Sequence, residues 1–71
     1  MAENAWQYWL DDFHLPLRTC GDRAELRQLS TGKWIPYDYK AAGYLRIGCA
    51  AWGMDYNKCT EKEAEYFFNH F

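Results

Sequence analysis

The sequence lacks several features that would assign it to a class at once. None of its apolar stretches approaches the ~18 uninterrupted residues that a membrane-spanning helix needs. The N-terminus MAENAWQYW has neither a basic start nor a long apolar segment, so we expect no secretory signal and a cytoplasmic location. Basic residues are not in excess, because eight Lys and Arg face ten Asp and Glu. A surface devoted wholly to nucleic acid is therefore not expected.

The sequence also lacks the spacings that build metal sites and catalytic centres. Its cysteines Cys20, Cys49 and Cys59 are odd in number, and neither they nor the two histidines pair at the short spacings of a zinc site. We predict reduced thiols, no metal and no cofactor, although a Cys20–Cys59 disulfide stays open. There is no glycine-rich phosphate loop, and adjacent Asp11 and Asp12 would point about 100° apart on a helix. We therefore predict that the chain is not an enzyme.

Aromatic side chains, in contrast, are abundant. Four Trp, six Tyr and four Phe make up 20% of a chain of 71 residues, which we expect to form one domain over residues 1–71. Each ring can remove roughly 150–250 Å² from water. A domain of this size buries only about 60% of the surface that its unfolded chain exposes. Some rings should therefore stay partly exposed, as they do in protein-binding surfaces.

The N-terminal segment shows the spacing of an amphipathic helix. Between Glu3 and His14 the apolar side chains recur every three or four residues, and Glu3 or Asn4 would serve at the start of the helix. Pro16 forces the preceding residue out of the helical region, so the helix should end by His14. We expect residues 15–22 to be a connection.

A β-hairpin is predicted next in the chain. Residues 23–29 and 33–39 flank Ser30-Thr31-Gly32, which places a glycine where a left-handed conformation is needed. The second segment is rich in residues that favour strands. Pro36 removes one hydrogen-bond donor from this strand and so predicts that it lies at an edge of the sheet.

The segment from Lys40 to Gly53 is predicted to be a core helix around which the remaining elements pack. Lys40 and Arg46 are its only charges, and apolar or small side chains fall on one face at helical spacing. A strand over Tyr44 to Ile47 is the alternative. The alanine pairs on both sides favour the helix.

The C-terminal helix has the clearest start signal in the chain. Thr60 and Glu63 have the spacing of a capping box. A buried stripe should follow at Ala64, Phe67, Phe68 and Phe71. The predicted fold class is therefore α+β, a small domain with the order α-β-β-α-α: N-terminal helix, hairpin, core helix, C-terminal helix.

These patterns favour a protein that recognises another protein. We expect a phage- or mobile-element-encoded inhibitor or modulator, monomeric or homodimeric, that binds a large host enzyme such as RNA polymerase or a defence nuclease. The predicted binding residues are Trp34, Tyr37, Tyr39, Arg27 and Lys33. The alternative is a nucleic-acid-binding module, in which the same basic and aromatic hairpin would stack on bases and neutralise phosphates.

Overall fold

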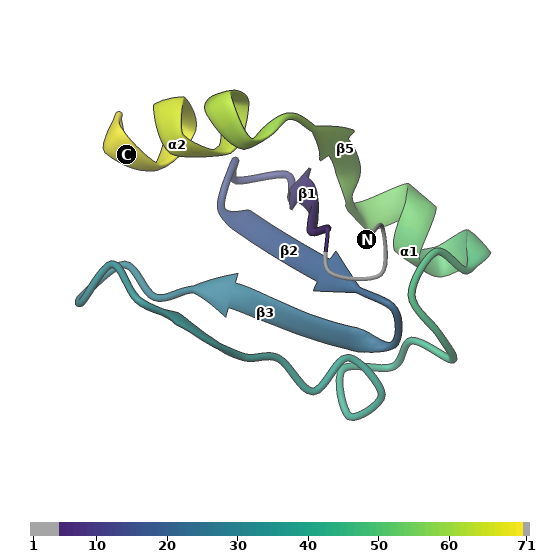
Figure 1. Ribbon diagram of the computed structural model, residues 1–71. Coiled ribbons are helices and arrows are strands. Elements are labelled where there is room, and N and C mark those ends of the chain that lie inside the picture. Colours follow the sequence, from purple (N-terminus) through teal and green to yellow (C-terminus); the bar gives the residue numbers. More distant parts are fainter. Residues whose placement is uncertain (1–4, 71) are drawn as a thin grey trace.

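The computed structural model describes residues 5–70, and its centre is an antiparallel sheet of five strands (Figure 1). The sheet order is β4-β3-β2-β1-β5, so the last strand of the chain pairs with the first. Two helices follow late in the sequence. The elements are β1 Gln7–Leu10, β2 Pro16–Cys20, β3 Arg23–Arg27, β4 Trp34–Pro36, α1 Ala50–Asp55, β5 Asn57–Cys59 and α2 Glu61–Asn69. The predicted order α-β-β-α-α is therefore wrong.

The predicted N-terminal helix is replaced by a strand and a turn. Trp9 is buried on one face of the sheet with Leu17, while Leu10 is buried on the other with Pro16. A strand that is covered on both faces shows no simple alternation, and its apolar residues can imitate helical spacing. The proposed helix start at Glu3 or Asn4 lies outside the described residues.

The predicted connection over residues 15–22 is in fact the central strand β2. Pro16 is the first residue of β2, a position where the missing proline N–H removes a single hydrogen bond from the sheet. The hairpin prediction is confirmed, because β3 and β4 pair antiparallel and β4 lies at the sheet edge. Gly32 has a φ of 74°, the left-handed conformation that the turn requires.

The predicted core helix over Lys40 to Gly53 is also wrong for most of its length. Residues 40–49 form a series of turns, and only α1 is helical, beginning at Ala50. Gly43 and Gly48 have φ angles of 106° and 83°, which a right-handed helix cannot contain. Tyr44 to Ile47 is consequently neither helix nor strand.

The C-terminal helix is confirmed as α2. The Thr60 side chain accepts a hydrogen bond from the Glu63 backbone N–H at 3.1 Å, and the Glu63 carboxylate accepts one from the Thr60 N–H at 2.9 Å. Both bonds of the capping box are therefore present. Ala64 is buried and Phe67 and Phe68 are partly buried, while Phe71 lies outside the described residues.

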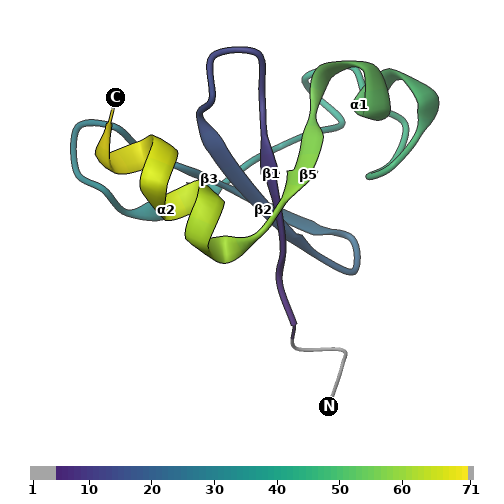
Figure 2. The same cartoon turned by 90° about the horizontal axis from the view of Figure 1, so that it is seen from above.

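The two faces of the sheet are covered by different parts of the chain (Figures 1 and 2). The register places Trp9, Leu17, Thr19, Ala24 and Leu26 on one face, which we call the core face. The segment of residues 37–56, including α1, lies over it. The opposite face bears Tyr8, Leu10, Arg18, Glu25, Arg27 and Trp34. We call it the α2 face because helix α2 packs against β1 and β2 there.

Trp52 is the centre of the core. Its side chain has no exposed surface, and the rings of Trp9, Tyr39, Tyr44 and Tyr56 surround it with centroid distances of 4.5–6.2 Å. Its indole N–H is buried without a hydrogen-bond partner in the described part of the chain. A neutral donor left in this way costs about 1–3 kcal/mol. The burial of the large ring offsets that cost.

Candidate protein-binding surface

The structure separates the five predicted binding residues between the two faces of the sheet. Trp34 and Arg27 are direct cross-strand partners on the α2 face, and Lys33 is exposed just before β4. Tyr39 is buried on the core face, where its hydroxyl donates to the Asp22 carbonyl at 3.0 Å. Tyr37 is partly buried against the same core. The five therefore form no single surface, and Trp34 with Arg27 marks the part that stays together.

Trp34 belongs to a row in which aromatic rings alternate with guanidinium groups across the α2 face. The Arg18 guanidinium carbon lies 4.2 Å from the Trp6 ring centroid and 4.5 Å from the Trp34 centroid. Arg27 lies 5.8 Å from the Trp34 centroid and 4.0 Å from that of Phe68 on α2. Such contacts contribute about 0.5–1 kcal/mol each at exposed sites. We call these five residues the cation–π row.

Both inner cations of the row are also paired with carboxylates. Arg18 contacts Glu25 on the neighbouring strand at 2.6 Å, and Arg27 forms an ion pair with Glu65 of α2. The Arg18 and Glu25 side chains are 21% and 17% exposed, so the pair is partly shielded from water. The two guanidinium groups of the row are therefore held by ion pairs that locally neutralise their charges.

Helix α2 covers only one end of this face. Leu10 and Pro16 point to that end and are buried, and Arg27 links the helix to β3. The remaining part carries Trp6, Tyr8, Arg18, Arg23 and Trp34, and among residues 5–70 no helix lies over it. We call this part the open half of the α2 face. Its residues are partly or fully exposed.

Sequence reasoning missed Trp6, Tyr8 and Arg18 as members of this surface. Trp6 and Tyr8 are two residues apart and so share a face of a strand, a signal that the helical interpretation of the N-terminus obscured. Arg18 lies in the segment that was expected to be a connection. Arg18 and Glu25 are direct cross-strand partners, and opposite charges in such a pair are typical of the less buried face of a sheet.

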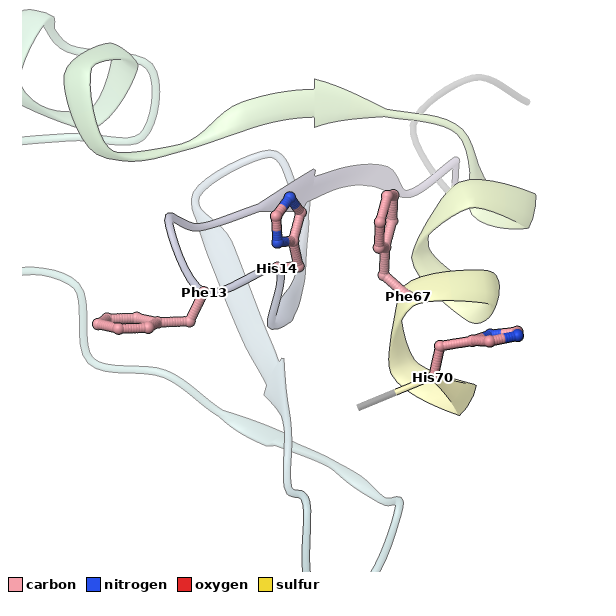
Figure 3. Close-up of a pocket in the computed structure, with 4 residues that line it drawn as sticks. All are labelled: Phe13, His14, Phe67 and His70. Atoms are coloured by element: carbon pink, nitrogen blue, oxygen red, sulfur yellow. The ribbon is translucent and has the colours of Figure 1, made fainter.

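A shallow hollow of about 260 Å³ lies at the other end of the molecule, between the β1–β2 loop and α2 (Figure 3). It is lined by Phe13, His14, Phe67 and His70. The His14 and Phe67 rings stack with a centroid distance of 4.7 Å. Phe13 points away from the other three side chains. The hollow is smaller than typical ligand pockets, which measure about 300–1,000 Å³.

Local hydrogen bonds hold the side chains around this hollow. The Asp11 carboxylate accepts bonds from the Phe13 and Leu15 backbone N–H groups, both at 2.9 Å, and so shapes the loop in which His14 has a φ of 62°. His70 Nδ1 lies 2.7 Å from the Tyr66 carbonyl oxygen. Since a carbonyl can only accept, Nδ1 carries the proton. These bonds hold the loop and the helix end each in shape, and the His14–Phe67 stack is the contact that joins the two.

Two exposed apolar side chains lie on the segment of residues 37–56, which covers the core face. Leu45 and Met54 are 87% and 82% exposed. They are sequence neighbours of Tyr44 and Asp55, which are joined by a 2.5 Å hydrogen bond from the tyrosine hydroxyl to the carboxylate. Leucine is under-represented among the residues that dominate binding energies. We therefore rank this pair below the cation–π row.

The pKa values of Tyr56, Cys59 and Cys49 are shifted by their surroundings. Burial, reinforced by the hydroxyls of Tyr37 and Tyr44, raises the pKa of Tyr56 far above its ordinary value. Burial also raises the pKa of the Cys59 thiol. The pKa of Cys49 is lowered, because backbone N–H groups at the start of α1, first that of Trp52, stabilise its thiolate. None of these groups lies among the exposed side chains of the open half.

The comparisons with known proteins leave the function to be argued from this geometry. No protein-family model matches the chain, and comparisons with curated proteins and with solved structures found no significant match. Within residues 5–70, no group of three His, Cys, Asp or Glu side chains is placed to hold a metal ion. Neither helix in the described part of the chain is long and apolar enough to cross a membrane.

Proposed function

We propose that the chain is a small non-catalytic regulator that binds a larger protein through the open half of the α2 face. The observation that supports this most is the stack of Trp6, Arg18 and Trp34 on sheet surface that no described helix covers. Trp, Tyr and Arg are the residue types most enriched among binding hot spots. Because ion pairs and ring contacts already hold Arg18 and Arg27 in place, binding would cost little side-chain entropy.

The partner that we propose is a large host enzyme in the cytoplasm, such as RNA polymerase or a defence nuclease. Two observations support this choice: the net charge of the sequence is slightly negative, and the open half of the α2 face is rich in aromatic rings. A protein of this kind would act by covering a surface of its target.

Nucleic acid is the second candidate, and the ion pairs weigh against it. Phosphate binding needs cations that are free to replace counterions. Arg18 and Arg27 already have carboxylate partners, and Arg23 is the remaining cation of the α2 face without an ion pair among the described strands and helices. One cation without an ion pair among residues 5–70, beside the single ring of Trp6, is a weak phosphate site.

Affinity capture with matched variants tests the proposal. Tagged wild-type chain, Trp34→Ala and Leu45→Ala would be exposed to bacterial lysate and to purified RNA polymerase, with and without nuclease and at two salt concentrations. We expect one large protein to be retained by wild type and Leu45→Ala, to resist nuclease and high salt, and to be lost with Trp34→Ala. Loss of all binding on nuclease treatment would move the function to nucleic acid. Circular dichroism of each variant confirms that it is folded.

A further inference from the structure

We infer that the open half of the α2 face binds an extended, proline-rich segment of its partner that carries an acidic residue at one end. This inference rests on the proposed function and names the chemistry of the partner at the same surface. Two observations support it: the sheet edges have few free backbone groups for pairing with a partner strand, and the open half carries more hydrogen-bond donors than acceptors.

The sheet edges are poorly suited to adding a partner strand. The hydrogen bonds from Gln28 N–H to the Lys33 carbonyl and from Tyr37 N–H to the Ala24 carbonyl mark bonded pairs on either side of β4. Because bonded and non-bonded pairs alternate, Trp34 and Pro36 turn their backbone groups away from β3. Proline has no N–H, so this edge offers one donor. At the other edge, β5 has three residues with Lys58 at its centre.

The open half, in contrast, is rich in donors and poor in acceptors. The indole N–H groups of Trp6 and Trp34 and the Tyr8 hydroxyl make no hydrogen bond within residues 5–70. The Glu25 carboxylate, an acceptor on this face, already receives two bonds from Arg18. A matching ligand therefore presents many acceptors and few donors. A polyproline II segment has this character, since its carbonyls are unpaired and its prolines have no N–H.

Three aromatic rings of the open half also lie close together. Tyr8 and Trp34 meet edge to face, with a centroid distance of 6.0 Å and an interplanar angle of 64°. The Arg18 guanidinium carbon lies within 4.5 Å of the ring centroids of both Trp6 and Trp34. Proline-rich segments dock into grooves lined by aromatic rings, and they need no backbone ladder because they are already extended.

Charge gives the segment its direction. Among residues 5–70, the α2 face carries Arg18, Arg23 and Arg27 against Glu25 and Glu65, and Arg23 is the cation without an ion pair in this part of the chain. Its guanidinium lies 5.8 Å from the Trp6 centroid at one end of the row, and its side chain is exposed. An acidic residue of the ligand would therefore lie beside Trp6 and Arg23. A nucleic acid would offer a phosphate at every step and would meet the carboxylates of Glu25 and Glu65 as well.

The four tryptophans supply a direct readout. Full-length ¹⁵N-labelled chain would be titrated with a synthetic peptide of two glutamates followed by six prolines, and the four indole N–H cross-peaks would be followed. We expect the peaks of Trp6 and Trp34 to shift. Those of Trp9 and Trp52 lie on the core face and should stay in place.

Matched peptides and variants sharpen the result. Replacing the prolines by alanines should weaken binding about tenfold, since the segment loses its preformed shape.

The protein variants test the individual side chains. Tyr8→Phe removes one hydroxyl and should weaken peptide binding about fivefold, and Trp34→Ala should weaken it about 30-fold. Arg23→Glu should weaken the acidic peptide about threefold and leave a peptide of prolines alone unchanged. Met54→Ala, on the opposite side of the sheet, should bind as wild type does.

The outcomes separate this inference from the function on which it rests. If excess proline peptide moves none of the four indole peaks while a captured protein partner moves those of Trp6 and Trp34, the inference fails and the proposed function stands. If oligothymidylate moves these peaks and the peptide does not, both fail. Equal binding of the proline and alanine peptides would also overturn the inference.

Discussion

The two faces of the sheet carry the same kinds of side chain in opposite settings. On the core face, Trp52 is enclosed by four rings, and the Trp9 indole donates to the Thr19 hydroxyl at 3.0 Å. On the α2 face, Trp34 lies against guanidinium groups and is partly exposed. A guanidinium group can cover part of a ring while its charged end stays in contact with water, so a ring covered in this way can remain at the surface. Because both residues are tryptophans, it is the groups that each one contacts that decide whether it belongs to the core or to a partly exposed surface.

Removing Trp52 should have the largest effect on stability. Trp52→Ala empties the centre of the core, and the loss of a buried ring of this size costs about 3–5 kcal/mol. A small domain has a total stability of about 5 kcal/mol. We expect the variant to be largely unfolded by circular dichroism and denaturant titration. A cooperative transition like that of the wild type would show that the core is elsewhere.

The matched substitution on the α2 face should separate stability from binding. Trp34→Ala removes contacts with two guanidinium groups and should lower the free energy of unfolding by about 1–2 kcal/mol. Partner binding should weaken by about 2 kcal/mol or more. Urea unfolding and titration of the captured partner measure the two quantities. If the variant unfolds as completely as Trp52→Ala, Trp34 is a core residue and the contrast between the faces is lost.

A milder change tests whether the row depends on the planar guanidinium. Arg18→Lys keeps the positive charge but loses the flat group that lies between two rings and the double contact with Glu25. We expect the free energy of unfolding to fall by about 1 kcal/mol. Lys33→Arg, at an exposed position, is the control. Equal stability of both variants would show that the stack contributes nothing measurable.

The core face should show its own dependence on pH. The folded pKa of Tyr56 lies above the ordinary value near 10, so the folded state keeps a proton that the unfolded state releases. Stability is therefore unaffected below about pH 10 and falls as the pH rises beyond it. Urea unfolding at pH 8 and pH 10.5 should show this fall in the wild type and a smaller one in Tyr56→Phe. Exposed Tyr66→Phe, as a control, should retain the full fall.

The smallest effect concerns the thiols. Cys49 has a lowered pKa and Cys59 a raised one, so at neutral pH a larger fraction of Cys49 is thiolate. Iodoacetamide should therefore label Cys49 first, as read by mass spectrometry of the digested protein. Faster labelling of Cys59 would contradict the assignment of these environments.

The elements that sequence reasoning predicted correctly are those with purely local causes. Thr60 and Glu63 satisfy each other's backbone within one helical turn, and Gly32 supplies the conformation of the hairpin turn. The errors arose where tertiary contacts decide. Trp6 and Trp9 mimic a helical stripe, yet Trp9 lies on the core face and Trp6, just before β1, contacts Arg18 on the α2 face. Gly48, which was expected to lie within a helix, is held in a turn because the covering segment must pack Tyr44 and Trp52 against the sheet.

Only part of the candidate surface could be predicted from the sequence. Trp34 and Arg27 could be placed together because a local turn sets their pairing. Trp6, Tyr8 and Arg18 join them through the pairing of β1 with β2, which joins segments that were expected to be a helix and a connection. Tyr37 and Tyr39 have the same composition signal as Trp34 but pack against the core. Nothing in residue type alone separates the two groups.

Hydrogen exchange of the four indole N–H groups tests the contrast between the faces most directly. Trp9 Nε1 is hydrogen-bonded and Trp52 Nε1 is fully buried, so both should exchange only when the protein unfolds. Trp6 and Trp34 form no such bond with any residue from 5 to 70 and lie on the open half, so they should exchange orders of magnitude faster. Equal protection of Trp34 and Trp52 would show that the α2 face is closed, and the surface on which the proposed function depends would not exist.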